Sequence, residues 1–154
     1  MLRGNCARGT AALESLVVAA VICGCGGPAY EVAEVNGTVT INGQPGHQLR
    51  VQFVPNVDAG TSGPTSTGDT DKQGRFTLEM RESPTSEVRP GAVVGNHLVV
   101  FTDLQLAASA TGAGIPVRVK PEYALPGTTP LTKQVAAGSQ TIEIQFAGNG
   151  AAIP

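Results

Sequence analysis

The chain has 154 residues, which is enough for one domain once a leader is set aside. Its formal net charge is −2 at pH 7, and this balance argues against nucleic acid as a partner. Glycine (20 residues) and proline (11) are plentiful, whereas only 4% of the residues are aromatic. Together with many valine, threonine and isoleucine residues, this composition predicts short strands joined by tight turns.

The amino-terminal residues have the arrangement of a secretory signal peptide. Arg3 and Arg8 form a positively charged region, residues 16–22 form a short apolar run, and small residues follow. The run is much shorter than the roughly 20 residues that a membrane-spanning helix needs. Residues 1–24 are therefore predicted to direct export and to be removed. The alternative is a short buried helix of a cytosolic protein, but no helical periodicity continues past Gly24.

All three cysteines lie within the first 25 residues. Residues 21–25 resemble a bacterial lipobox, in which a small residue precedes the modified cysteine because it must fit the pocket of the signal peptidase. Gly24 before Cys25 meets this requirement, whereas Ile22 before Cys23 does not. The resemblance therefore implies cleavage between Gly24 and Cys25 and lipidation of Cys25.

Lipidation of Cys25 would place the protein in the cell envelope, on the periplasmic or extracellular side of a membrane. The resemblance implies a diacylglyceryl thioether and an amide-linked chain on Cys25, and two or more acyl chains hold a protein firmly. Residues 25–33 are then a lipidated tether. The alternative, a metal or redox pair of Cys23 and Cys25, lacks a further cysteine or nearby histidine to complete four ligands.

The rest of the chain alternates between apolar and polar residues in the manner of β-strands. Turn signals such as Asn42-Gly43 separate the patterns, and no helical stripe is longer than a turn or two. About seven short antiparallel strands predict an all-β, two-sheet sandwich over residues 34–148, followed by a tail at 149–154. The clearest strand patterns are 35–41, 49–53, 75–80, 97–101 and 141–146, and the weaker ones are 65–70, 117–120 and 131–135.

Four motifs follow one another in the first half of this region: Val35-Asn36-Gly37-Thr38-Val39, Asn42-Gly43-Gln44-Pro45, Val51-Gln52-Phe53-Val54-Pro55 and Thr70-Asp71-Lys72-Gln73-Gly74-Arg75-Phe76. Their order and spacing resemble the carboxypeptidase regulatory-like (transthyretin-like) domains of small secreted lipoproteins, especially in planctomycete bacteria. The later stretch 121–138 is also similar to that group. The resemblance implies a seven-stranded prealbumin-like sandwich and no assigned activity, and fold analogy does not transfer function.

Residues 69–74 resemble the start of a calcium-binding loop, with oxygen ligands at alternate positions and glycine in the sixth. The twelfth position of such a loop requires a glutamate, and here it is Met80. The pattern is more typical of a turn between two strands, in which aspartate bonds to nearby backbone. A weak surface cation site on Asp69 and Asp71 remains the alternative.

No catalytic constellation is evident. His47 is expected in a loop and His97 at the start of a strand, and neither has a carboxylate at zinc-ligand spacing. Transthyretin-like enzymes that hydrolyse hydroxyisourate carry a tyrosine-containing motif at the carboxy terminus, which residues 148–154 lack. No Gly-x-Ser-x-Gly or phosphate-binding loop occurs. We therefore expect no enzymatic activity, no catalytic residue and no cofactor.

The sequence favours a lipid-anchored binding or interaction module whose partner is an unknown envelope protein or glycan. Loops 55–68, 81–95 and 103–116 are the expected contact surfaces, because loops on a rigid scaffold can vary freely. A carbohydrate-binding module is one alternative. It is weakly supported, since the chain has no tryptophan and Tyr123 is the single tyrosine beyond the tether. A purely structural envelope component is the other alternative.

Overall fold

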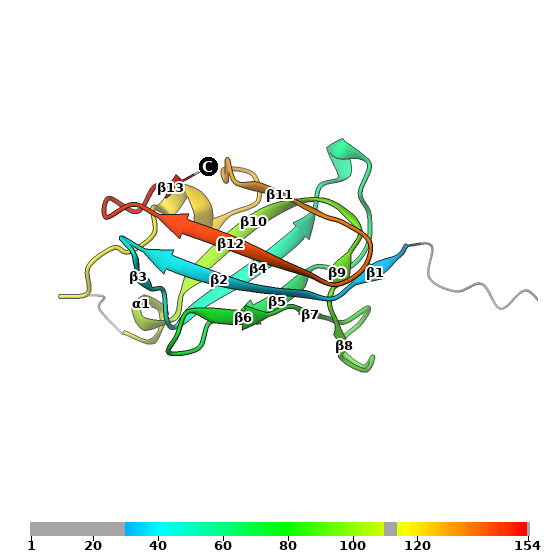
Figure 1. Cartoon of the computed structure of the whole chain (residues 1–154), viewed down its shortest axis with the longest axis horizontal. Helices are drawn as coiled ribbons and strands as arrows, with labels where there is room; N and C mark the ends of the chain where they lie inside the picture. The colour runs from blue at the N-terminus through cyan, green and yellow to red at the C-terminus, as the bar shows by residue number, and fades with distance from the viewer. Residues whose placement is uncertain (1–29, 110–113, 154) are drawn as a thin grey trace, which may run out of the picture.

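The computed structural model describes residues 30–109 and 114–153, which form a mostly β domain (Figure 1). The predicted signal peptide, residues 1–24, and the predicted lipidation site, Cys25, lie outside the described residues. No helix in the described part of the chain is long and apolar enough to cross a membrane.

The larger sheet has six strands in the order β11-β10-β4-β5-β7-β8, and all its pairs are antiparallel. Its longest strand, β10, lies between β11 and β4, as its nearly continuous apolar sequence predicts for a central strand. The strands are β4 (Leu49–Pro55), β5 (Ser66–Asp69), β7 (Glu79–Met80), β8 (Arg89–Pro90), β10 (Gly95–Asp103) and β11 (Thr132–Val135).

The smaller sheet has five strands and contains a parallel pair. Its order is β13-β12-β2-β3, and β6 also pairs with β2. β12 runs parallel to β2 over seven residues of each strand, so the prediction of a wholly antiparallel sandwich is wrong for this pair. Alternation marks a strand but carries no information on its direction. The strands are β2 (Val35–Ile41), β3 (Gln44–Pro45), β6 (Arg75–Thr77), β12 (Gln140–Phe146) and β13 (Ala152–Ile153).

The segment predicted as one strand, 75–80, is divided between the two sheets at Leu78. β6 pairs with β2 in the smaller sheet, whereas β7 pairs with β5 in the larger one. Between them, Leu78 N–H donates to the Val35 carbonyl and Leu78 C=O accepts from Gly91 N–H. The alternation continues across the break because both sheets face the same core, so the pattern could not reveal it.

The other weak or missing predictions concern short segments. Residues 65–70 and 131–135 do contain strands, whereas residues 117–120 form none, so that strand prediction is wrong. The loop after β10 begins with a one-turn helix, α1 (Leu104–Ala108), which was not predicted. Two 3₁₀ turns are also present: η1 (Val57–Ala59) after β4 and η2 (Pro121–Ala124) before β11.

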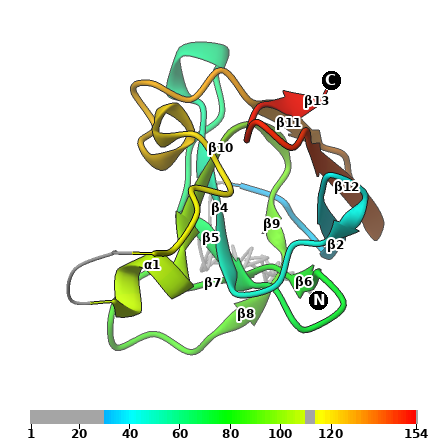
Figure 2. The same cartoon turned by 90° about the vertical axis from the view of Figure 1, so that its left-hand side faces the viewer.

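The two sheets face each other across a single apolar core (Figure 2). Phe101 and Phe146 meet edge to face, with ring centroids 5.0 Å apart, and Tyr123 packs on Phe146 at 5.4 Å. Inward-facing residues alternate with exposed ones, most regularly along β12. The completely buried core residues of the long strands include Val39, Leu49, Val51, Phe53 and Val99.

Strand pairing extends beyond the predicted domain limits of 34–148. At the amino-terminal side, β1 (Val32–Ala33) pairs with β9 (Ala92–Val93) in a separate two-stranded sheet. At the carboxy-terminal side, β13 pairs with the end of β12. Part of the predicted tether, 25–33, and part of the predicted tail, 149–154, are therefore attached to the domain.

Candidate functional site

A cluster of polar side chains lies where β10 ends beside the start of β4, at what we call the distal end of the domain. Arg118 donates from Nε to Oδ2 of Asp103 at 2.8 Å and from Nη2 to Oδ1 at 2.6 Å. The side chains of Arg118 and Asp103 are only 14% and 10% exposed. Arg118 also donates to the carbonyls of His47 at 2.8 Å and Gln48 at 3.4 Å. One guanidinium thus joins three segments of the chain.

Asp103 has a second role as the N-cap of α1. Its carboxylate accepts hydrogen bonds from the backbone N–H groups of Gln105 and Leu106. Burial opposes ionisation of Asp103, but the ion pair with Arg118 and these two N–H groups together hold its pKa below the usual value. The carboxylate is therefore ionised at neutral pH and both of its oxygens are occupied, which leaves it unsuited to act as a general acid or base.

His47 lies in the loop between β3 and β4 and takes part in the same cluster. The side-chain amide nitrogen of Gln105 donates to Oε1 of Gln48 at 2.7 Å and lies 3.2 Å from Nε2 of His47. Because the amide nitrogen is a donor, Nε2 of His47 is the acceptor in this contact. In the part of the chain that the structure describes, no group of three or more potential ligands is placed to hold a metal ion.

An apolar hollow of about 320 Å³ adjoins this cluster, between α1 and residues 117–121. This volume is at the small end of the range for ligand pockets and suits one or two apolar side chains. Two residues of its lining are well exposed, Leu106 at 39% and Val117 at 61%. The apolar lining residues are Phe101, Leu106, Ala107, Val117, Val119, Pro121 and Ala124.

The structure places Asp69 and Asp71 on the wall of one shallow hollow, but each carboxylate already has partners. Asp69 accepts two hydrogen bonds of 2.8 Å from Arg50, and these lower its pKa. Asp71 accepts from the backbone N–H groups of Arg75 and Gln73, both at 2.8 Å, and these bonds lower its pKa. The geometry at Asp71 is that of a turn stabilised by hydrogen bonds from the backbone to the aspartate side chain.

His97 lies inside the larger sheet and not on the surface. It is the third residue of β10, is completely buried, and packs 5.7 Å from the ring of Phe53. Its Nδ1 lies 3.1 Å from the Gly95 carbonyl and must donate to it, whereas its buried Nε2 has no protein partner. Burial lowers the pKa of His97 despite the bond to Gly95. The imidazole is a neutral core residue.

Sequence reasoning did not single out Asp103 or Arg118. A signal was present, because Asp103 lies two residues after the apolar strand pattern 97–101 and Arg118 lies between two valines. No family model, curated protein or solved structure matches the chain.

Proposed function

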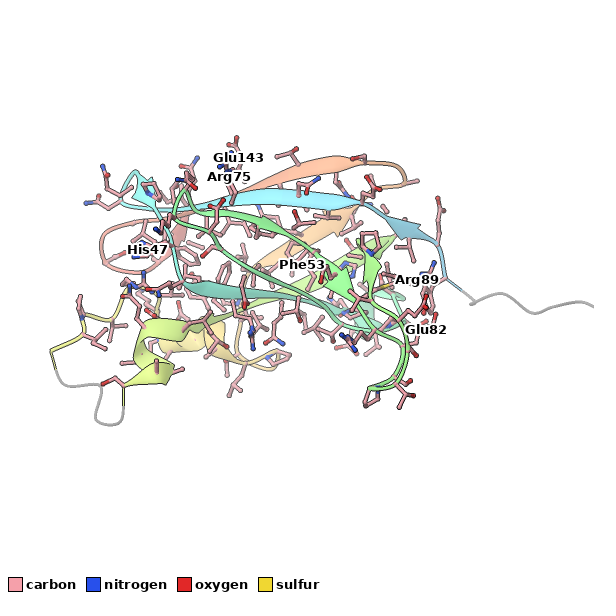
Figure 3. All side chains as sticks on the ribbon, turned by 90° about the horizontal axis from the view of Figure 1, so that it is seen from below. His47, Phe53, Arg75, Glu82, Arg89 and Glu143 are labelled. Carbon is pink, nitrogen blue, oxygen red and sulfur yellow. The ribbon has the colours of Figure 1, made fainter. Side chains whose placement is uncertain are left out.

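We propose that the protein is exported, anchored by lipid on Cys25, and serves as a non-catalytic interaction module in the cell envelope. The observation that carries this proposal is that the chain enters the domain at one end, whereas the apolar hollow lies at the opposite end. The chain enters at the end near Glu82 and Arg89, which we call the proximal end, whereas His47 marks the distal end (Figure 3). A protein anchored through its amino terminus would thus keep the apolar hollow accessible to a partner.

The proposed fold is the prealbumin-like sandwich that the transthyretin-like resemblance implies. Its support is the pair of facing sheets with one core and the short strands joined by tight turns. One of these turns follows β2, where Asn42 and Gly43 both have positive φ, as a two-residue hairpin of the favoured type requires.

The non-catalytic part of the proposal is supported by the state of the polar groups at the distal end. Asp103 and Arg118 neutralise each other, and His47 accepts a hydrogen bond from Gln105. No group in this cluster combines a free proton acceptor with a nucleophile in reach. The distal end instead presents apolar surface, at Leu106 and Val117, beside the Asp103–Arg118 ion pair.

The geometry favours a protein partner over a glycan. Sugar rings are usually held by stacking on exposed aromatic side chains. Tyr123, the tyrosine that could have served, is only 4% exposed and packs on Phe146. The apolar hollow instead suits the apolar side chains of a partner protein. Of the three predicted contact loops, the described part of 103–116 belongs to this distal end, whereas 55–68 and 81–95 include the turns at the proximal end.

The anchor is tested by intact and peptide mass spectrometry of protein purified from the membrane fraction. We expect a mature chain that begins at Cys25 and carries acyl mass. Cys25→Ala should abolish both processing and acylation, whereas the matched control Cys23→Ala should leave both unchanged, because Cys23 departs with the leader. An unmodified chain that retains Met1 would contradict the proposal.

The interaction surface is tested by photo-crosslinking in native envelopes, with a photoreactive residue introduced at Val117. We expect a discrete crosslinked product that Leu106→Asp removes, because a carboxylate would be unfavourable in the apolar hollow. The same photoreactive residue at Val57, which is 72% exposed at the proximal end, is the control. Identical products from both positions would contradict a specific distal surface.

A further inference from the structure

The first described residues are fastened to the proximal end and do not form a free tether. Tyr30 donates its hydroxyl proton to Oε1 of Glu82 at 2.7 Å, and Arg89 donates to the same oxygen at 3.3 Å. Glu82 and Arg89 lie beside each other near the point where the chain enters the domain (Figure 3). In addition, Val94 N–H donates to the Glu31 carbonyl at 2.9 Å.

The next two residues extend this attachment through strand pairing. Val32 and Ala33 pair with Val93 and Ala92, and Ala33 is only 2% exposed. Gly91, at φ +107°, passes so close that a Cβ there would collide with the Ala33 carbonyl. Hydrogen bonds, strand pairing and close backbone contact together fix the direction in which the chain leaves the domain.

This attachment makes the tether shorter than its predicted length. The sequence alone predicts a tether of residues 25–33, but residues 30–33 are fastened to the domain. Four residues, 26–29, separate Cys25 from Tyr30, the first residue with a described contact, so these two residues are five steps apart along the chain. At no more than about 3.5 Å per extended residue, these five steps span at most roughly 18 Å. A lipid on Cys25 would thus hold the proximal end within this distance of the bilayer surface.

Two turns flank the point where the chain enters, one after β4 and one before β8 (Figure 1). Each exposes a valine: Val57, in η1, is 72% exposed, and Val88, just before β8, is 40% exposed. Their sequence neighbours include charged residues of both signs: Asp58 follows Val57, and Glu87 and Arg89 flank Val88. The surface is therefore suited to contact a bilayer through its apolar side chains and not through charge attraction.

We propose that the proximal end lies on the lipid bilayer, with Val57 and Val88 in contact with its interfacial region and the distal hollow directed away. This proposal rests on the proposed lipid anchor at Cys25. The two valines alone are too small an apolar surface to bind a membrane, so the anchor supplies the affinity and the fastened stem, residues 30–33, sets the orientation.

The experiment uses the lipidated protein, purified from membranes and reconstituted into phosphatidylcholine–phosphatidylglycerol vesicles that contain headgroup-labelled nitroxide lipid. An acylated Cys25 leaves the mature chain without a free thiol, so a single introduced cysteine can be labelled with a fluorophore. The proximal positions are Val57→Cys and Val88→Cys, and the distal control is Val117→Cys, which is 61% exposed in the native chain. We expect quenching at least threefold stronger at both proximal positions.

Equal quenching at the proximal and distal positions of an acylated protein would overturn the orientation and leave the lipid anchor intact. Absence of acyl mass on the purified protein would overturn both the anchor and the orientation. The stem is tested separately with Tyr30→Ala combined with Glu82→Ala. We expect this variant to keep its acyl mass and its folded state while the difference in quenching between the two ends shrinks; an unchanged difference would contradict the orienting role of the stem.

Discussion

Arg118 and Asp103 are joined by two hydrogen bonds of 2.8 and 2.6 Å while both side chains are largely shielded from water. The pair connects the segment after α1 to the end of β10, and Arg118 continues to the carbonyls of His47 and Gln48. It therefore sets the position of one wall of the apolar hollow. Removing one partner of such an ion pair destabilises the fold mainly because the other charge stays shielded from water without a partner.

Arg118→Met is expected to lower the free energy of unfolding by about 2–4 kcal/mol, slightly below the range for fully buried pairs, because Asp103 would remain ionised without its partner. Urea denaturation at pH 7.5 measures this. The matched control is Arg50→Met, which breaks the pair with Asp69, whose side chains are 45% and 48% exposed. That change should cost less than about 1 kcal/mol. Equal losses for the two variants would show that the shielding of Asp103 is not important.

The buried imidazole of His97 predicts a loss of stability in mild acid. Its pKa in the folded protein lies below the ordinary value of 6.5, so the unfolded chain binds the proton more readily. The contribution of the neutral His97 imidazole to stability is fully present above about pH 6.5. It is lost as the pH falls toward the folded-state pKa of His97. Between pH 7.5 and 5.5 the free energy of unfolding should fall by up to about 1.4 kcal/mol.

Paired urea titrations at the two pH values measure this effect in three proteins. The chain has two histidines, so each can be removed in turn. His97→Leu should abolish most of the difference in the free energy of unfolding between the two pH values, whatever its effect on stability at pH 7.5. His47→Asn is the matched control, in which the buried His97 is retained and the difference should persist. A difference that persists in His97→Leu would refute the assignment to His97.

Gly37 is predicted to tolerate no side chain. It pairs with Ile142 on one side and Phe76 on the other, and a Cβ there would collide with the Ile142 carbonyl and the Phe76 ring. Gly37→Ala should therefore cost about 1–3 kcal/mol, the usual range for overpacking. Thermal unfolding measures the change. Gly127→Ala is the control, because a Cβ there would meet nothing within 4 Å, and it should leave the melting temperature almost unchanged.

The hydroxyl of Tyr123 is predicted to fasten the last strand. It accepts a hydrogen bond of 2.9 Å from the Ala152 N–H, while the ring packs on Phe146. Tyr123→Phe keeps the ring and removes the acceptor, so the expected loss of stability is about 1 kcal/mol. Hydrogen exchange of the Ala152 amide should be faster in this variant, whereas the amides of β10 should remain as protected as in the native protein. Unchanged protection at Ala152 would count against this role.

Much of the secondary structure could be predicted from the alternation of apolar and polar residues. β2, β4, β10 and β12 appear close to their predicted positions because each long strand has one face in the core. The turn predicted at Asp71 is also present, since the Asp71 carboxylate accepts hydrogen bonds from the backbone N–H groups of Gln73 and Arg75.

The remaining features depend on contacts between distant segments, which a local pattern does not contain. Leu78 passes from one sheet to the other without interrupting the alternation. The parallel direction of β12 relative to β2 depends on the path of the whole intervening chain. For the candidate site, His47 was noted, but its connection to Asp103 through Arg118 joins residues far apart in sequence and could not be read from spacing.

The pairing of β2 with β12 also has a consequence for when the domain can fold. These strands lie side by side along their whole length, yet they stand near opposite ends of the domain's sequence. Such long-range contacts form slowly, because most of the chain must be ordered before they can close. A polypeptide that crosses a membrane with its amino terminus first would lack β12, the parallel partner of β2, until almost all of it had passed. If the chain is exported as proposed, folding of the smaller sheet would therefore wait until translocation is nearly complete, and the chain would stay unfolded while it crosses the membrane.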